Sequence, residues 1–324
     1  MKKKILVTGS GGVCGKALKR ISNNYPKYKF IFVSSKDLDL RNIKKTINFI
    51  KLHKVEYIIN FAAVSGGIGL SINHQASLLR DNTLININIL EASVQCNVKK
   101  LILCLTTGMY PEKAKLPLIE KNIQNGPPSN TNYGSSYAKR LIEPAIKAYR
   151  DEFKLNVIGL IPSGIYGPED NFNKNDAPML PAIINKMYDA KIKNKELKVW
   201  GTGKPLREYT YSEDIAKIFI WALEKYNKEQ VINIGTTEEK SIKEITYIIA
   251  KKLKFPQNKI IFDKLKPDGI FKKSSSNKLF LANIKKFNYT TLNSGIEKTI
   301  NWFLKAKKLK KIFKTNEKIK EFKY

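Results

Sequence analysis

Residues Lys4 to Gly15 read KILVTGSGGVCG, and this stretch decides how the rest of the chain is interpreted. The apolar run predicts a buried strand, and Gly9 then predicts a turn too tight for a Cβ atom. Gly12 allows the backbone to approach a ligand, and Gly15 allows the next helix to pack against the strand. The start of that helix offers free N–H groups and a positive dipole end to a pyrophosphate. The stretch therefore predicts a dinucleotide-binding βα unit, with an ordinary glycine turn as the plainer alternative.

Strand and helix patterns alternate after this unit. This alternation, with near-continuous apolar strands, is typical of an α/β fold with a Rossmann-like doubly wound parallel sheet covered on both faces. From residue 171 on, the elements become shorter and predict a smaller interleaved α/β lobe at the C-terminal side. The patterns predict strands at 29–33, 57–63, 101–105, 197–200, 231–234 and 260–262, and helices at 15–23, 43–52, 80–95, 180–191, 214–225 and 242–253.

The end of the second strand bears on the choice of cofactor. An acidic residue commonly ends this strand and binds the ribose 2′-hydroxyl of NAD. Here the strand ends in two hydroxyls and a cation, which suit a 2′-phosphate and predict NADP(H), unless they are merely loop residues. We expect cofactor contacts from the glycine turn, from strand ends and from one helical lysine: Gly9, Gly12, Gly15, Ser34, Ser35, Lys36, Asp39, Ala62, Ala63, Lys139, Pro162 and Ile165.

The domain organisation follows from these patterns. We expect an NADP(H)-binding Rossmann domain over residues 1–170, to which part of 205–235 returns. Residues 171–324 are then expected to form mainly a substrate-binding lobe.

The net charge of +31 raises the question of a nucleic-acid partner. Lysines are spread along the whole chain with carboxylates among them, and the densest run, 305–320, lies on a helical pattern. This distribution predicts a solvated lysine-rich surface and no nucleic-acid partner.

The composition disfavours a membrane protein, a disulfide-bonded protein and a metalloprotein. No run approaches the roughly 18–20 apolar residues that span a bilayer, and no apolar signal-peptide core follows the N-terminal lysines, so we expect no membrane association and a cytoplasmic protein. Cys14, Cys96 and Cys104 have no paired spacing and are expected to be reduced thiols. With only two histidines, His53 and His74, we expect no metal site.

Several strings together resemble the GDP-L-fucose synthase family of extended short-chain dehydrogenase/reductases. They are residues 125–128, 136–140, 166–172, 199–208 and 267–273, and the resemblance extends from the first strand to about residue 303. It implies a GDP-sugar substrate, NADPH, epimerisation at C3 and C5 of GDP-4-keto-6-deoxymannose, and reduction at C4. It also implies a homodimer formed through helices at about 80–95 and 135–153.

The resemblance implies roles for individual residues. Lys139 matches the family's active-site lysine, and Thr106 replaces its catalytic serine. The GDP-sugar is expected at Asn132, Trp200, Arg207 and Lys273, of which the last two suit a diphosphate and Trp200 offers a flat apolar wall. Taken singly, each would be read as a surface charge or a core aromatic.

Three departures from the family pattern concern proton transfer. Gly108 and Pro178 stand where the family has the cysteine and histidine that epimerise C3 and C5. Ser135 stands where the family has its catalytic tyrosine, four residues before Lys139. Tyr137 should point away from Lys139, and Tyr133 could reach the site only if the helix begins late.

The sequence therefore predicts a GDP-L-fucose synthase-like NADP(H)-dependent oxidoreductase acting on a GDP-4-keto-6-deoxyhexose. We expect C4-keto reduction without epimerisation, with Thr106, Lys139, Ser135 or Tyr133 as candidate catalytic residues. The alternatives are another transformation of a GDP-sugar, or a catalytically silent protein that binds a nucleotide sugar or NADP(H).

Overall fold

The computed structural model describes residues 2–173, 176–266 and 268–309. Its centre is a six-stranded sheet in the order β2-β1-β3-β4-β5-β10, and each neighbouring pair is parallel. This confirms the predicted Rossmann-like doubly wound sheet, and the strand order reverses between β1 and β3. The strands are β1 (Lys3–Thr8), β2 (Tyr28–Val33), β3 (Tyr57–Asn60), β4 (Lys100–Cys104), β5 (Val157–Ile161) and β10 (Ile232–Asn233).

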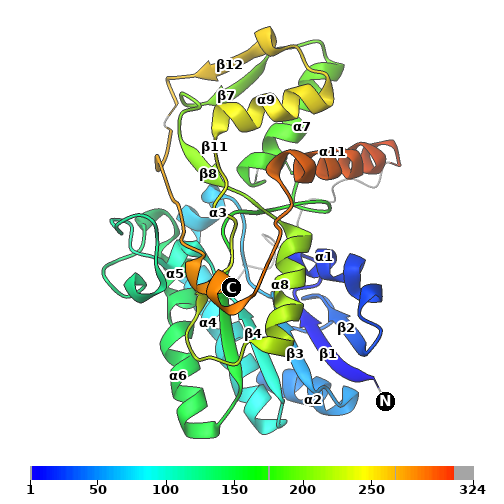
Figure 1. Ribbon diagram of the computed structural model, residues 1–324, viewed down its shortest axis with the longest axis vertical. Helices are drawn as coiled ribbons and strands as arrows, with labels where there is room; N and C mark the ends of the chain where they lie inside the picture. Colours follow the sequence, from blue (N-terminus) through cyan, green and yellow to red (C-terminus); the bar gives the residue numbers. More distant parts are fainter. Residues whose placement is uncertain (1, 174–175, 267, 310–324) are drawn as a thin grey trace.

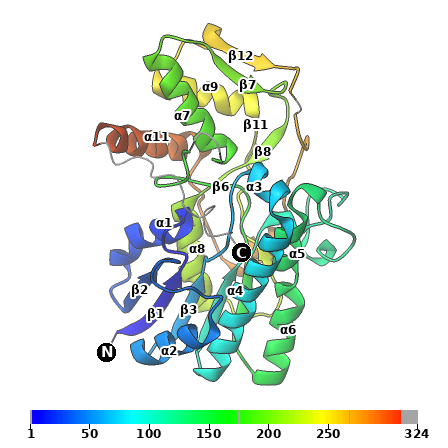
Figure 2. The same ribbon diagram turned by 180° about the vertical axis from the view of Figure 1, so that it is seen from behind.

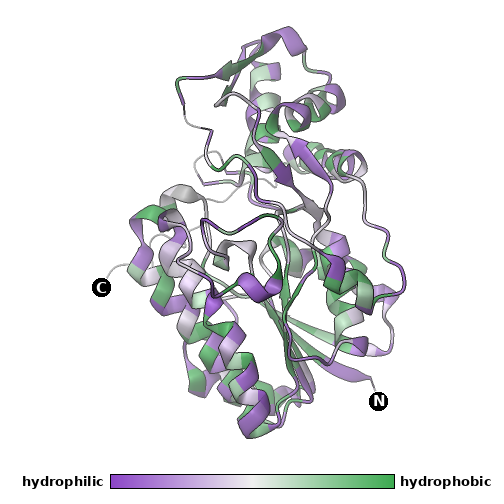
Figure 3. Cartoon of the chain, turned by 60° about the vertical axis from the view of Figure 1, so that its left-hand side comes forward, coloured by the Kyte–Doolittle hydropathy of each residue, from purple (hydrophilic) through white to green (hydrophobic). Residues whose placement is uncertain are grey.

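Both faces of the sheet are buried because successive side chains along each strand point to opposite sides. Leu6 of β1 belongs to one apolar cluster, whereas its neighbours Ile5 and Val7 belong to the other. The strands of the sheet are accordingly coloured as mostly hydrophobic in Figure 3. One face is covered by α2 (Ile43–His53), α4 (Gln75–Gln95), α5 (Tyr133–Arg140) and α6 (Ile142–Phe153), and the other by α1 (Val13–Ile21) and α8 (Ser212–Lys225) (Figures 1 and 2).

A smaller lobe lies beyond the carboxyl ends of the sheet strands, at the top of Figure 1. Its three main helices pack around a separate apolar cluster that includes Phe172 and Phe303. The chain enters this lobe after β5, returns to the sheet through α8 and β10, and then enters the lobe again. The lobe and its connections contain α7 (Met179–Ile192), α9 (Ile242–Leu253), α11 (Leu292–Lys308), β6 (Ile165–Tyr166), β7 (Leu197–Trp200), β8 (Leu206–Glu208), β9 (Thr210–Tyr211), β11 (Glu239–Ser241) and β12 (Ile260–Asp263).

Most predicted elements occur within two residues of their expected bounds, and the exceptions have local causes. The strand predicted at 57–63 ends at Asn60, and the helix predicted at 80–95 begins at Gln75. The helix expected at 135–153 is interrupted at Leu141, between α5 and α6. Pro144 explains the interruption, because it has no N–H to donate to the carbonyl of Arg140 and its ring crowds that carbonyl.

Two features of the sequence extend beyond the described residues. The lysine-rich run at 305–320 is described only to residue 309, and position 267 of the string 267–273 also lies outside. Within the described ranges, no helix is both long and apolar enough to cross a membrane.

Candidate functional site

The turn after β1 is held in place by two backbone approaches that exclude a side chain. Gly9 has φ +67°, and a Cβ there would lie 2.6 Å from the amide nitrogen of Ala62, just beyond β3. A Cβ on Gly15 would lie 2.5 Å from Cα of Ser10. Distances this short do not occur between non-bonded carbons, so the fold itself requires glycine at both positions.

Gly12 differs from these two glycines because its Cβ side is open. A Cβ there would meet its nearest neighbour, the carbonyl oxygen of Gly9, at 3.4 Å, an ordinary contact. Gly12 directly precedes α1, and no side chain caps the helix start. The free N–H groups of the first turn therefore face a surface that a diphosphate can approach closely, so the residues present fit the predicted cofactor.

The strand end predicted to select NADP(H) is organised by an aspartate that the sequence analysis passed over. Asp37 accepts hydrogen bonds from the backbone N–H of Ser34 at 2.8 Å and from its hydroxyl at 2.7 Å. These bonds lower the pKa of Asp37. Ser35 and Lys36 are exposed and could contact a 2′-phosphate directly, whereas the hydroxyl proton of Ser34 is engaged.

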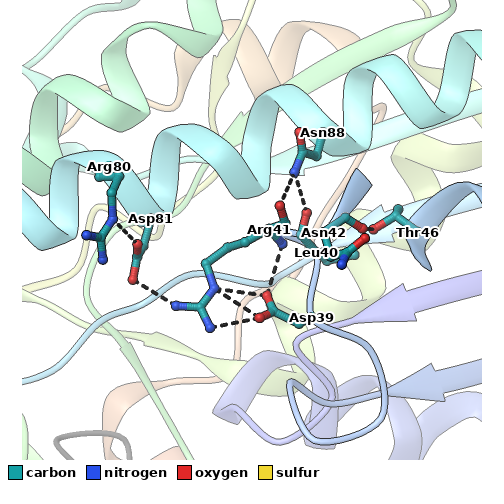
Figure 4. A network of polar contacts seen from close by, with 8 residues as sticks. All are labelled: Asp39, Leu40, Arg41, Asn42, Thr46, Arg80, Asp81 and Asn88. Atoms are coloured by element: carbon teal, nitrogen blue, oxygen red, sulfur yellow. Dashed lines mark hydrogen bonds and ion pairs between the residues drawn. The ribbon is translucent and has the colours of Figure 1, made fainter. Parts of the chain in front are cut away.

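Asp39, which is expected to contact the cofactor, lies in an ion-pair network (Figure 4). Its carboxylate accepts from Nη2 of Arg41 at 2.8 Å, while Nη1 of the same guanidinium pairs with the buried Asp81 of α4 at 3.0 Å. Asn88 of α4 donates to the carbonyls of Leu40 and Arg41, both at 2.8 Å. Asp39 and Arg41 thus fasten the loop after β2 to α4, and nothing in the sequence pattern indicated Arg41.

The remaining expected cofactor positions lie at the carboxyl ends of β3 and β5. Ala62 donates its N–H to the side-chain oxygen of Asn60, which also accepts from the hydroxyl of Thr8 at 2.6 Å. Ala63 follows and is half-buried. Pro162 is buried directly after β5, and Ile165 begins β6. These positions lie at the carboxyl ends of the sheet strands, the edge at which doubly wound sheets bind their ligands.

The candidate catalytic residues come from β4 and α5. Thr106 follows β4, and its hydroxyl oxygen accepts from the N–H of Gly108 at 3.1 Å. Lys139 is buried and donates from Nζ to the carbonyl oxygen of Cys104 at 2.8 Å. Ser135 lies one turn before Lys139, and its hydroxyl donates to the carbonyl of Asn132 at 3.0 Å. The structure therefore places Lys139 at the end of β4, with Thr106 two residues further along the chain.

Tyr133 is not brought to Lys139. It is the first residue of α5, so the helix does not begin late. Its side chain is 44% exposed and packs on Tyr137, with ring centroids 4.6 Å apart. Tyr137 precedes Lys139 by two residues and Tyr133 precedes it by six, which correspond to rotations of about 200° and about 240°, so neither ring shares the Lys139 side of the helix.

The glycine at the family's cysteine position is surrounded by polar atoms. A Cβ on Gly108 would lie 2.9 Å from Nδ2 of Asn132 and 3.5 Å from the hydroxyl of Ser136. The Ser136 hydroxyl is buried and has no hydrogen-bond partner within the described ranges. The amide of Asn132 thus takes up part of the volume that a side chain at position 108 would need. Pro178, at the family's histidine position, is exposed and directly precedes α7.

On the substrate side, Trp200 presents a 63% exposed indole ring to solvent. The ammonium groups of Lys186 and Lys266 lie 5.9 and 5.7 Å from its centroid. The turn that follows is held by Asp268, whose carboxylate accepts from the backbone N–H and the hydroxyl of Thr202 at 2.6 and 2.7 Å. No role was predicted for Asp268 from the sequence. Its hydrogen bonds to Thr202 join the segments 199–208 and 267–273.

Arg207 and Lys273 are two half-buried cations that act on each other electrostatically. Burial lowers the pKa of Lys273, and the guanidinium of Arg207 lowers it further. Burial also lowers the pKa of Arg207. Neither residue has an ion pair with a carboxylate in the described part of the chain, and two such cations repel each other unless an anion joins them. Their placement can hold a phosphate or diphosphate group.

The comparisons define the class of the protein. The model of the NAD dependent epimerase/dehydratase family matches residues 5–235. The chain therefore belongs to this family.

Within the family, the chain is similar to proteins that make GDP-sugars. It is 34% identical to the GDP-L-fucose synthase of Dictyostelium discoideum, over 94% of this chain and 96% of that protein. It is 33% identical to a GDP-L-fucose synthetase of Naegleria fowleri solved with NADP, with TM-score 0.89 over 95% and 96% of the chains. It is 25% identical to a GDP-mannoheptose C4 reductase of Campylobacter jejuni solved with NADP, with TM-score 0.84 over 94% and 98%.

The open side of Gly12 generates a prediction about the cofactor. Gly12→Ala should leave the fold intact, because φ −87° and ψ 171° suit alanine and the new Cβ makes no short contact. The methyl group would occupy the approach of the diphosphate, so NADP(H) affinity should fall by about tenfold or more, measured by titration calorimetry. Gly15→Ala provides the contrast, since its Cβ has no room and the thermal midpoint itself should fall. Unchanged cofactor affinity in Gly12→Ala would contradict this site.

The cation pair generates a second prediction. Lys273→Met should preserve or raise the thermal midpoint of the ligand-free chain, because it removes a half-buried charge repelled by Arg207. The same change should weaken GDP binding by about tenfold or more in calorimetry, because a phosphate partner is lost. Lys272→Met is the matched control, since Lys272 pairs with Glu239 at 2.8 Å and should leave GDP affinity unchanged. A lower midpoint with unaltered GDP affinity would argue for a structural role of Lys273.

Proposed function

We propose that this chain is an NADP(H)-dependent reductase of a GDP-linked 4-keto-6-deoxyhexose that reduces C4 without epimerising C3 or C5. The observation that carries the proposal is the half-buried cation pair Arg207–Lys273, together with Thr106 and Lys139 at the end of β4. Relatives named for GDP-sugar synthesis and a relative solved with NADP support the substrate class and the cofactor.

The restriction to reduction follows from two residues. Epimerisation at C3 and C5 needs groups that remove and return protons. In the GDP-L-fucose synthases, which this chain resembles, these groups are a cysteine and a histidine. Gly108 and Pro178 stand at those positions, and neither side chain can carry a proton. The similar protein from Campylobacter jejuni is named as a GDP-mannoheptose C4 reductase, and this name gives reduction at C4 without epimerisation.

The chain's residues would share the work as follows. The turn at Gly12 and the start of α1 hold the cofactor's diphosphate, and Arg207 and Lys273 hold that of the GDP-sugar. Trp200 supplies a flat surface for the nucleotide, and the Thr106 hydroxyl orients the C4 carbonyl. When bound, NADPH supplies the hydride. In this proposal residues 1–170, with the returning part of 205–235, bind NADP(H), and 171–324 mainly bind substrate.

A second candidate is a silent protein that binds the nucleotide sugar or NADP(H). Ser135 favours it, because a serine hydroxyl is shorter than a phenol and a far weaker acid. Either candidate fits a reducing compartment such as the cytoplasm, since Cys14, Cys96 and Cys104 are all free thiols.

The decisive experiment supplies freshly made GDP-4-keto-6-deoxymannose and NADPH in D₂O and follows NADPH absorbance. A C4 reductase should consume NADPH and yield a GDP-6-deoxyhexose with no deuterium at C3 or C5, read by NMR. Deuterium at those carbons would show that another residue performs epimerisation. Binding of both ligands without NADPH loss would identify the silent protein, and absence of GDP-sugar binding would refute the substrate class.

We also propose a homodimer formed through α4 and the α5–α6 segment. The support is a set of exposed apolar side chains on these helices, among them Leu84 at 40%, Leu141 at 45% and Phe153 at 45%. Sedimentation of the chain should therefore give about twice the monomer mass, and Leu141→Glu should shift it to the monomer. A monomeric natural chain at micromolar concentration would refute this arrangement.

A further inference from the structure

The groups able to donate a proton near the end of β4 are few. Tyr133 and Tyr137 pack on each other on one side of α5, and the guanidinium of Arg140 lies 5.1 Å from the Tyr137 ring. Ser135 and Lys139 are four residues apart and share the other side. Neither phenol of α5 therefore shares the side of this helix that carries Ser135 and Lys139.

Lys139 is in an environment that favours release of its proton. It is 8% exposed, and its Nζ has one described protein partner, the neutral carbonyl oxygen of Cys104. Burial lowers the pKa of Lys139. No carboxylate pairs with it within the described ranges, so no negative charge stabilises the ammonium form.

The groups packed around α5 leave this environment uncharged. From β4 comes the Cys104 thiol, whose pKa is raised by burial to about 11 and which is therefore neutral at pH 7. The segment of His74 and Gln75, which follows α3 (Ile68–Asn73), packs against the start of α5, where a Cβ on Gly134 would lie 2.0 Å from the Gln75 carbonyl. The groove between α4 and the α5–α6 segment contains no titratable side chain: it is lined by Thr83, Asn86, Ile87, Leu90, Ala138, Leu141, Ile142 and Ala145.

We propose that Lys139 is itself the acid that protonates the reduced carbonyl oxygen, through a water molecule bound at the Ser135 hydroxyl. The inference rests on the proposed reductase function and changes the role of the lysine, from an electrostatic helper of a tyrosine to the proton donor. The serine is several ångströms shorter than a tyrosine, and the volume it leaves lies on the Lys139 side of the helix. The Ser135 hydroxyl donates to Asn132 and keeps its lone pairs available to that water.

The step balances without any further reactant. The C4 carbon accepts the hydride and forms the C–H bond, while the π electron pair of the carbonyl moves to oxygen. That oxygen takes a proton from the water, and the water takes one from Nζ of Lys139. The neutral amine left behind regains its proton from solvent after product leaves, and Thr106 holds the oxygen in position throughout.

A double-mutant cycle between positions 135 and 139 tests the proposal. Lys139→Arg keeps the positive charge but not the acidity, so kcat of the natural chain should fall by about 10²–10⁴-fold. In the Ser135→Tyr background the phenol supplies the proton, and Lys139→Arg should cost about tenfold at most. NADP⁺ affinity, measured by calorimetry, should be similar in all four proteins, which separates proton transfer from ribose binding.

The pH profile gives an independent reading. An acid must be protonated to act, so kcat of the natural chain should be level at low pH and fall as pH rises through the lowered pKa of Lys139. Tyr133→Phe and His74→Asn are the matched controls and should leave both kcat and this profile unchanged.

Each outcome separates this inference from the proposed function. If Lys139→Arg lowers kcat by the same factor in the natural chain and in the Ser135→Tyr variant, Lys139 is not the proton donor, although the proposed reductase activity still holds. An active Ser135→Tyr variant with an inactive natural chain would also overturn it, and would keep the substrate assignment. Loss of the natural activity in His74→Asn would transfer the acid role to His74. No turnover in either background would refute the proposed function itself.

Discussion

The close backbone approach at the turn after β1 is the constraint on which the rest of the structure depends. Gly9 touches the exit of β3, and Gly15 lets α1 lie directly on the turn. This fixes α1, whose Arg20 pairs with Glu169, just after β6, at 2.5 Å and with Glu213 of α8 at 3.0 Å. Glu169 has φ +63°, a conformation that costs a non-glycine residue about 1 kcal/mol or more and is maintained by these contacts.

The smaller lobe is organised around a carboxylate in a comparable way. Asp268 closes the turn after Trp200 through Thr202, and a Cβ on Gly201 would lie 2.2 Å from its Oδ1. Asp268 thereby joins the segment that contains Trp200 and Arg207 to the segment that contains Lys273. Glycines fix the turn after β1, and Gly201 and Asp268 fix the turn after Trp200. The side chains proposed to face the ligands can therefore change while these two turns stay in place.

The sequence predicted the parts of the fold that depend on local pattern. The strand–turn–helix unit, the parallel sheet and its two covered faces follow from apolar periodicity and glycine spacing. The interruption at Leu141 was missed because the helical pattern continues through Pro144. The ion pair between Arg41 and Asp81 joins residues that are 40 positions apart, and no local pattern reveals such a pair. Tyr133 remained a candidate until the start of α5 was known.

Gly108, Pro178 and Ser135, which depart from the GDP-L-fucose synthase pattern, are each accommodated by their immediate neighbours. The residues proposed to bind the ligands are therefore distinct from the positions expected to transfer protons. The amide of Asn132 fills part of the volume beside Gly108, and the Asn132 carbonyl accepts the Ser135 hydroxyl. Pro178 stands just before α7, where a missing N–H costs no helical hydrogen bond. Arg207 and Lys273, in contrast, are half-buried, and the glycine turn is fixed by backbone contact. The proposed loss of the acid and base groups therefore requires no change in the segments that hold Arg207, Lys273 and the glycine turn, because a reaction is decided by a few side chains at strand and helix ends while the fold positions what is bound.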